Sequence, residues 1–268
     1  MKRLIFSLLY EDGYFVLSRN FNRQKVGDIN WLIKNYNFEI ISHGIDELII
    51  IDISKNVKRE KFFSDVKQIS KKIFIPITLG GSIESLKDVD FYLKNGADKI
   101  LLNSAFFENL DLVKNIARQF GKQFIIGCID YKISNNEIKI YKNRAKKLCV
   151  DLTLKKHIDN ILEIGAGEIM LQSIDFDGTG MGIDLKIIEE IQKLKVICPI
   201  ILKGGIGKPD HIRSILLDKK VNAICTANLF NFIGNTFNKT RNLLYKENIE
   251  LAKWKPDTIY KFENIFKK

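Results

Sequence analysis

Short runs of apolar residues alternate with longer amphipathic stretches along the whole chain. Each apolar run has the length of a buried β-strand, and each amphipathic stretch repeats its apolar positions with a helical period. The predicted strands cover residues 4–9, 47–52, 74–79, 99–103, 123–129, 168–173, 199–203 and 222–226. The predicted helices lie near residues 28–43, 59–72, 84–95, 108–119, 151–164, 184–194, 209–218 and 236–247. Apolar strands that alternate with helices indicate a parallel sheet covered on both faces.

Eight strand–helix units predict an α/β fold of the (β/α)8 TIM barrel type, which commonly uses about 250 residues. A doubly wound open sheet is the alternative, but no G-x-G-x-x-G motif opens a first helix. An internal repeat favours the barrel, because three segments of the first half recur in the same order, offset by 121 to 124 residues. These pairs are "GIDELIIIDIS" (44–54) with "GAGEIMLQSID" (165–175), "IPITLGGSI" (75–83) with "CPIILKGGI" (198–206), and, more loosely, "DKILLNS" (98–104) with "NAICTAN" (222–228). Two similar half-barrels would produce this spacing.

Composition places the chain among single-domain cytoplasmic proteins. No linker rich in glycine, serine or proline divides it, so residues 1–268 are predicted to form one barrel domain with a short extension from about residue 250. The four cysteines lie far apart without a C-x-x-C pair, which disfavours a disulfide framework or a zinc site. No apolar run approaches the roughly 20 residues of a membrane span. The apolar start resembles a strand rather than a signal peptide, because Glu11 and Asp12 follow it at once.

The formal net charge of +11 raises the question of nucleic-acid binding, although a genome-wide composition bias would give the same charge. The lysines are spread along the chain, and the densest cluster, "KNRAKKL" (142–148), contains no aromatic residue. This pattern disfavours nucleic-acid binding. An anionic small substrate explains the charge at least as well.

Glycine-rich turns follow the strands at the end where barrels of this type bind their ligands. Glycine lets the backbone approach an anion, and N–H groups at the start of the next helix point toward it. The first half offers Gly81, Ser82, Asn103 and Ser104, and the second half offers Gly204, Gly205 and Asn228. We call these two groups of turns the first-half and second-half cradles, and the end of the barrel where they lie the mouth. Because the cradles lie on opposite sides of the mouth, they predict a long substrate with a phosphate at each end. An ordinary βα turn remains the alternative for any single Gly-Gly pair.

The segment "LQSIDFDGTGMG" (171–182) combines two carboxylates with several glycines. No histidine or glutamate flanks Asp175 and Asp177, so a metal site is disfavoured, and no cofactor is implied. The turn follows the strand at 168–173, between the two cradles. We therefore expect the amides of Gly178 and Thr179 to join the second phosphate site and Asp177 to meet a substrate hydroxyl.

Together these motifs resemble the cyclase subunit family of imidazole-glycerol-phosphate synthase, over essentially residues 1–235. The resemblance is carried by "GIDELIIIDI", "IPITLGGSI", "GADKILLNSA", "IGCIDYK", "GAGEIMLQSIDFDGTGMG" and "PIILKGGIGKPDH". It implies a barrel that takes ammonia from a glutaminase docked at its bottom. The ammonia passes through the barrel to a bisphosphorylated substrate at the top.

The resemblance also implies a pair of aspartates that act as general acid and base, at the ends of the first and fifth strands. Asp130 in "IIGCIDYK" matches the fifth-strand acid, whereas Leu9 stands where the first-strand acid belongs. Glu11 and Asp12 fall in the following turn, displaced by several ångström. Two substrate-facing positions also depart from the family pattern, since Gln172 and Lys203 stand where small residues are usual. A lysine there can pair with a phosphate or occupy the space needed for cyclisation.

The lower end of the barrel keeps the family's charged ring. The matching gate residues are Arg3, Glu47, Lys99 and Glu168, and Asp98 matches an acid that faces the glutaminase. Charges inside a barrel are costly unless they pair, so we expect a mutually satisfied ring. Solvated charge at a barrel bottom is the alternative.

A chain that keeps the residues matching the ammonia route but lacks the first-strand acid resembles divergent members of this family that are found with surface-polysaccharide genes. These are implicated, with a glutaminase and a separate amidotransferase-like protein, in converting an acetamido sugar to an acetamidino sugar. We therefore expect an ammonia-conducting synthase subunit with Asp130 as its acid/base residue. The alternatives are an ordinary cyclase of histidine biosynthesis, with Glu11 or Asp12 as substitute, and a non-catalytic scaffold that activates the glutaminase.

Overall fold

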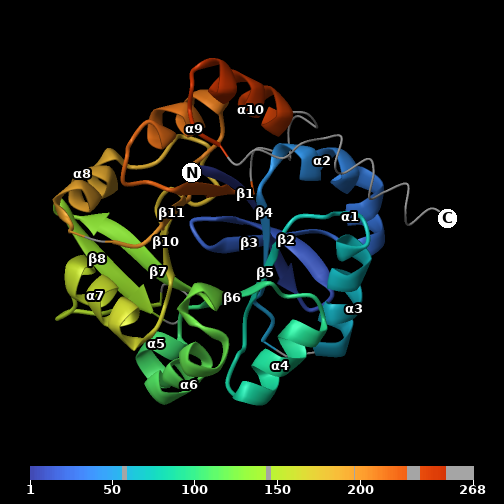
Figure 1. The fold of residues 1–268 in the computed structure, drawn as a ribbon, viewed down its shortest axis with the longest axis horizontal. Coiled ribbons are helices and arrows are strands. Elements are labelled where there is room, and N and C mark those ends of the chain that lie inside the picture. Colours follow the sequence, from blue (N-terminus) through green and yellow to red (C-terminus); the bar gives the residue numbers. More distant parts are fainter. Residues whose placement is uncertain (56–58, 143–145, 196, 228–235, 252–268) are drawn as a thin grey trace.

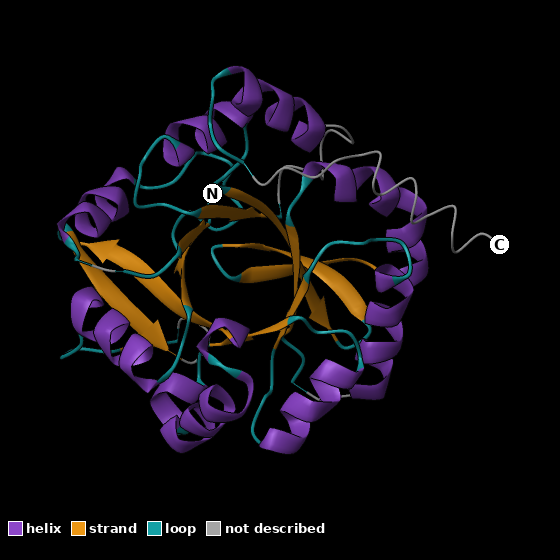
Figure 2. Ribbon diagram, viewed as in Figure 1, coloured by secondary structure: helices purple, strands orange, loops and turns teal. Residues whose placement is uncertain are grey.

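The computed structural model describes residues 1–55, 59–142, 146–195, 197–227 and 236–251. Eight parallel strands form a closed ring, each followed by helices on the outside (Figures 1 and 2). Around the ring the strands are β1 (Arg3–Glu11), β4 (Glu47–Asp52), β5 (Ile77–Gly80), β6 (Lys99–Leu102), β7 (Ile125–Ser134), β10 (Glu168–Ser173), β11 (Ile200–Lys203) and β12 (Ala223–Thr226). Pairing of β12 with β1 and of β7 with β10 closes the ring. The predicted (β/α)8 barrel is confirmed.

The helices agree with the predicted ranges except in two places, where a capping residue divides the helix predicted at 28–43 and where an unpredicted short helix precedes the one predicted at 108–119. They are α1 (Ile29–Asn35), α2 (Phe38–Gly44), α3 (Arg59–Ser70), α4 (Leu86–Lys94), α5 (Ala105–Glu108), α6 (Leu110–Phe120), α7 (Leu154–Ile164), α8 (Leu185–Lys193), α9 (Pro209–Leu216) and α10 (Thr236–Lys246). The predicted helix at 28–43 is wrong as a single element, because the Asn37 side chain caps α2 by accepting the Ile40 N–H. Asn109 ends α5 and caps α6 in the same way. Side-chain caps of this kind satisfy N–H groups that a continuous helix would use internally.

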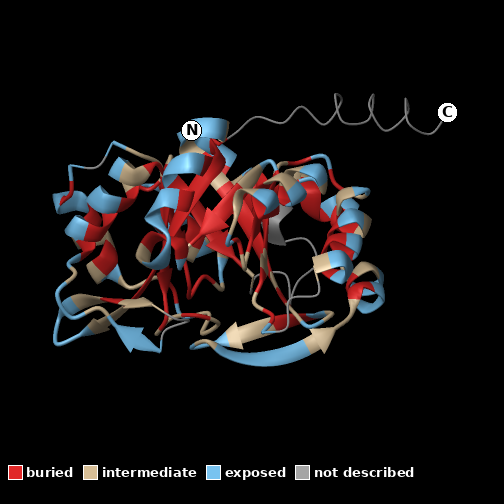
Figure 3. Ribbon diagram, turned by 90° about the horizontal axis from the view of Figure 1, so that it is seen from below, coloured by how far each residue is buried: buried red, intermediate tan, exposed pale blue. Residues whose placement is uncertain are grey.

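Two hairpins at the barrel mouth were not predicted. The strands β2 (Tyr14–Arg19) and β3 (Asn22–Gly27) continue antiparallel from β1, and β8 (Glu137–Lys142) and β9 (Lys147–Leu148) continue from β7. The strand β3 is mostly exposed and polar, so its sequence carries no apolar run. Figure 3 shows these exposed strands at the end of the barrel opposite the N-terminus.

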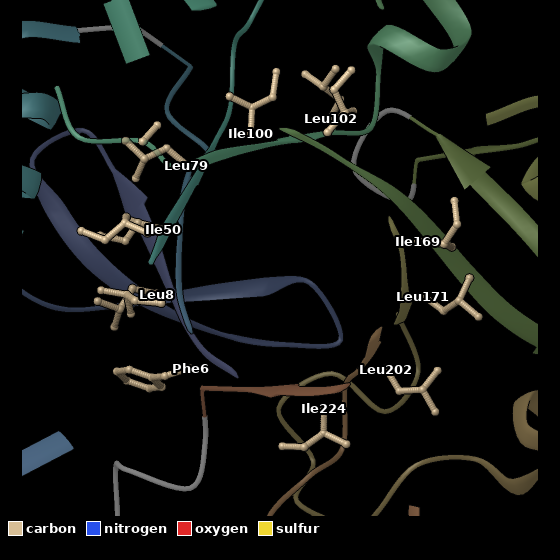
Figure 4. Packing of buried hydrophobic residues seen from close by; sticks show 14 of the residues in the cluster. Phe6, Leu8, Ile50, Leu79, Ile100, Leu102, Ile169, Leu171, Leu202 and Ile224 are labelled. Carbon is tan, nitrogen blue, oxygen red and sulfur yellow. The ribbon is translucent and has the colours of Figure 1, made fainter. Parts of the chain in front are cut away.

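Successive side chains of each strand point alternately out of and into the barrel, and they form two apolar layers. Side chains such as Ile50, Leu171 and Leu202 point away from the barrel axis and pack under the helices (Figure 4). The inward side chains form a second, smaller cluster inside the ring, made by Ile5, Ile49, Leu101, Ile126, Cys128, Met170, Ile201, Ala223 and Cys225. Strands buried on both faces explain why the eight predicted runs are continuously apolar.

Residues 250 and 251, the last that the structure describes, pair with the N-terminal residue Lys2. The backbone N–H of Lys2 donates to the Glu250 carbonyl oxygen over 2.7 Å, and Lys2 pairs with Leu251 in an isolated bridge. The extension predicted from about residue 250 otherwise lies outside the described residues. No helix in the described ranges is long and apolar enough to cross a membrane.

The buried His157 on α7 makes the fold sensitive to acid. Its ring stacks on Phe107 with centroids 4.6 Å apart, and burial lowers the pKa of His157 from 6.5 to about 4. The unfolded chain therefore takes up this proton as the pH falls through 6.5, whereas the native state takes it up only near 4. Across this window we expect the free energy of unfolding to fall by at most about 3 kcal/mol.

Urea unfolding at pH 7 and pH 4 measures this loss. His157→Phe removes the titrating group while keeping a ring on Phe107, so its stability should depend less on pH than that of the wild type. An equal pH dependence in both proteins would contradict the assignment.

Candidate active site

The barrel mouth contains two adjoining pockets that share Leu9 and hairpin residues. The larger, of about 600 Å³, lies over β4 to β7, and the smaller, of about 390 Å³, lies over β11, β12 and the turn after β10. The larger is lined by the predicted residues Gly81, Ser82, Asn103, Ser104, Asp130 and Gln172. The smaller is lined by the predicted residues Asp177, Gly178, Lys203, Gly204 and Gly205. The Gly81 turn of the first half thus lies at the larger pocket and the Gly204 turn of the second half at the smaller, while both pockets also take residues from the other half.

Asp130 is the carboxylate at the centre of this mouth. It lies on β7, is 6% exposed, and accepts a 3.0 Å hydrogen bond from Asn103 Nδ2 at its Oδ2. Burial raises the pKa of Asp130 to about 7, although nearby Lys203 and the Asn103 hydrogen bond oppose the rise. A carboxyl with a pKa near neutrality can both accept and donate a proton, as a general acid or base requires.

No carboxylate of β1 faces Asp130. Leu9 lines both pockets at this level of the barrel. Glu11 pairs instead with Arg23 of the hairpin. Asp12 lies in the exposed turn with φ 50°, and its N–H donates to Ser54 Oγ. Neither acid lines either of these two mouth pockets, so of the two carboxylates implied by the resemblance only Asp130 lies there.

The first-half cradle is a strained backbone turn after β5. Gly81 has φ +111°, and a Cβ on it would meet the Asp52 carbonyl oxygen at 2.0 Å. Only glycine tolerates this approach. The next residue, Ser82, also has positive φ, at 48°. The turn thereby brings its backbone close to that of Asp52 at the edge of the larger pocket.

The second-half cradle has the same construction after β11. Gly204 and Gly205 have φ of +111° and +83°, and a Cβ on Gly205 would meet the Gly182 carbonyl oxygen at 1.8 Å. The Gly182 N–H donates to the Gly205 carbonyl oxygen over 2.7 Å, which ties the cradle to the turn after β10. Asn228, predicted to complete it, lies outside the described residues.

The turn "DFDGTG" holds the tip of the β2–β3 hairpin. The N–H of Asn20 donates to the Asp177 carbonyl oxygen over 2.9 Å, and the N–H of Phe21 donates to Asp177 Oδ2 over 3.1 Å. A Cβ on Gly178 would meet the Ser18 carbonyl oxygen at 2.0 Å. Thr179 turns its hydroxyl to the Phe176 carbonyl oxygen and lines neither pocket. This segment therefore positions the hairpin over the mouth as well as lining the smaller pocket.

The four predicted gate residues form an ion-paired ring at the lower end of the barrel. Arg3 contacts Glu47 over 3.0 Å and also pairs with Glu168, and Lys99 contacts Glu168 over 2.6 Å and Glu47 over 3.5 Å. Burial alone would raise the pKa of Glu168, but Arg3 and Lys99 outweigh it and lower that pKa. Each charge is thereby compensated, as buried charges require.

The predicted partner-facing acid, Asp98, is exposed beside this ring. Its Oδ2 accepts the N–H of Ile77 over 2.8 Å, so it also fixes the start of β5. The apolar cluster inside the strands separates the ring from the mouth.

Comparison with known proteins identifies the family. Residues 3–235 match the family described as histidine biosynthesis protein. A protein of Parasynechococcus marenigrum (strain WH8102), provisionally named imidazole glycerol phosphate synthase subunit hisF2, is 38% identical over 255 residues, which is 94% of each chain. The imidazole glycerol phosphate synthase subunit HisF of Bacillus cereus (strain Q1) is 36% identical over 255 residues, or 93% of this chain and 98% of the relative. The chain belongs to the HisF-like family.

The resemblance inferred from sequence motifs is thus confirmed for the HisF-like family. The sugar-amidation subtype, the glutaminase partner and the roles of the site residues stay predictions. In the described residues no group of three or more histidine, cysteine, aspartate or glutamate side chains could hold a metal ion.

Several pocket residues of this HisF-like barrel were missed from the sequence. Arg19 and Arg23 of the hairpin line the smaller pocket, Lys55 and Lys146 line the larger, and Ser7 lies deep in the smaller. The alternation of β1 could have indicated Ser7, because it lies two residues before Leu9 and therefore faces the same way. The four cations carry no such signal, since they come from elements that the apolar pattern does not reveal.

Proposed function

We propose that this chain is the synthase subunit of a glutamine amidotransferase that works on a surface-polysaccharide sugar. A glutaminase docks at the barrel bottom beside Asp98 and releases ammonia at the charged ring. The ammonia passes through the barrel to a phosphorylated acceptor between the two glycine cradles. There its nitrogen bonds to the carbonyl carbon of an acetamido group, and the C–O bond breaks so that the oxygen leaves as water and an acetamidino group remains. A separate amidotransferase-like protein is the third partner.

The observation that carries this proposal is Leu9 at the mouth. A carboxylate at that position would be the second proton-transfer group of the family's cyclisation. Each positioned acid or base contributes about 100-fold to 10,000-fold to a rate. Glu11 is turned to Arg23, and Asp12 lies in the turn, so neither supplies the missing group. The centre therefore suits a reaction that needs one carboxylate, Asp130.

The lower half of the barrel supports the ammonia route. The ring of Arg3, Glu47, Lys99 and Glu168 closes the lower end, and the inward cluster above it is apolar. Neutral ammonia crosses an apolar passage at a lower free-energy cost than ammonium, because burying a charge without a partner is costly. Asn103 and Asp130 then receive it at the mouth.

Labelled glutamine tests the proposal directly. The chain, its glutaminase and the third protein are incubated with amide-¹⁵N glutamine and an acetamido sugar, and the product is analysed by mass spectrometry. Incorporation of ¹⁵N into an acetamidino product is expected, and Lys99→Ala should divert ammonia into solvent. If Asp130→Asn left incorporation unchanged while Lys99→Ala altered coupling, a non-catalytic scaffold would be the better description.

An ordinary cyclase of histidine biosynthesis is the second candidate, and the names of the relatives favour it. It would need another group to take the role of the first-strand acid. Turnover of the bisphosphorylated histidine intermediate with ammonium separates the two candidates, because only the cyclase converts it at a normal enzymatic rate.

A further inference from the structure

Lys203 is a buried cation that lacks a hydrogen-bond partner among the described residues. It ends β11, is 6% exposed, and lines the smaller pocket. Asp130 lies two strands away around the ring, since Gln172 pairs in register with both residues. The Asp130 carboxylate is turned to Asn103 and Cys128 instead. Because an unpaired buried ammonium is costly, its donors call for an acceptor from outside the described protein.

A second unused donor lies in the same pocket. Ser7 is 0% exposed, and apart from the Cys225 thiol its Oγ has no hydrogen-bond partner in the described ranges. The neighbouring Cys225 thiol is only a weak partner for it. Ser7 lies on β1 and Lys203 on β11, with β12 between them, because Lys203 pairs with Cys225 and Phe6 pairs with Thr226. Both residues line the smaller pocket, so one ligand there has two buried donors available to it.

The charge around this site suits an anion. Leu9 borders it and separates it from the larger pocket. A carboxylate in place of Leu9 would attract the Lys203 ammonium and repel an incoming anion. With Leu9 present, Asp130 balances Lys203 from a distance but forms no hydrogen bond with it. The ammonium thus keeps its donors for a ligand.

We propose that Lys203 and Ser7 form an oxyanion-binding site inside the barrel mouth, distinct from the backbone cradles. The acceptor places a phosphate or carboxylate group there, with the ammonium supplying charge and the hydroxyl a hydrogen bond. Its reacting carbon then lies across Leu9, on the side of Asp130. This inference rests on the proposed function and specifies an acceptor that is anionic next to its reacting carbon.

Lysine-labelled full-length chain tests the site by NMR. The Lys203 Cε resonance, assigned by its loss in Lys203→Arg, is followed during separate titrations with inorganic phosphate and acetate, with chloride at equal ionic strength as control. A saturable shift is expected with at least one oxyanion and not with chloride. Phosphate alone would assign a phosphorylated group, whereas an equal response to acetate would assign a carboxylate.

Variants make the test specific to this pair. Ser7→Ala should lower the affinity of the site for its anion about tenfold, as loss of one hydrogen bond to a charged ligand implies. Lys208→Met is the matched control, since Lys208 is exposed in the following loop, and it should bind as the wild type does. An unmoved Lys203 resonance with both oxyanions, or unchanged affinity in Ser7→Ala, would overturn the proposal. Either result leaves the ¹⁵N-transfer experiment unaffected, so the two failures are distinguishable.

Discussion

Asp130→Asn is expected to lower ammonia-dependent turnover by about 100-fold to 10,000-fold, because it removes the buried carboxylate proposed to transfer the proton. The amide keeps the size of the side chain but cannot accept a proton from the attacking nitrogen. Turnover is measured as ¹⁵N incorporation from ammonium into the acetamido sugar in the presence of the partner proteins. Asp12→Asn is the matched control, because Asp12 is exposed in the first turn and asparagine tolerates its positive φ.

The pH profile provides a second test of Asp130. Burial raises the pKa of this carboxyl to about 7, so the group is largely protonated below that value and ionised above it. Since the ionised form accepts the proton, activity should rise with pH around a midpoint near 7. A profile without this midpoint, or a control variant as impaired as Asp130→Asn, would contradict the assigned role.

Arg241→Met should cost about 3–5 kcal/mol of unfolding free energy, the usual result of removing one partner of a buried ion pair. Arg241 on α10 contacts Asp46 over 2.5 Å, and the two residues are 6% and 5% exposed. Asp46 Oδ2 also accepts the N–H of Leu4 over 2.8 Å. The substitution leaves the Asp46 charge buried and loosens α10 from the start of β1.

Urea unfolding at neutral pH measures this cost. Arg213→Met removes an exposed partner of Glu247, which also lies near the end of α10, so its midpoint should stay close to that of the wild type. Equal midpoints for Arg241→Met and the wild type would show that the buried pair does not hold α10 in place.

The barrel could be predicted because its strands are buried on both faces. "ELIIID" and "EIMLQS" were assigned with the bounds of β4 and β10, since each is a continuous apolar run bounded by polar turns. The β2–β3 hairpin could not be found in this way. Its strand "NRQKVG" is held by backbone pairing and by contacts with Asp177, which leave no apolar periodicity in the sequence.

The candidate site was predictable where its residues follow strand ends. Asp130, Asn103 and Lys203 could be placed at the mouth because the barrel fixes which end of each strand faces the ligand. That the donors of Lys203 and Ser7 lack partners could not be predicted from the sequence, because it depends on the positions of all neighbouring strands. The hydrogen bonds that the hairpin donates to Asp177 were not predicted for the same reason.

The most direct test of this account is the cyclase rate of the purified chain. Turnover of the bisphosphorylated histidine intermediate with ammonium is compared with that of HisF from Bacillus cereus under the same conditions. Because Leu9 stands where the resemblance places one of two proton-transfer groups, the rate should be at least about 100-fold lower than that of HisF. A comparable rate would show that one carboxylate suffices for cyclisation and would contradict a changed function.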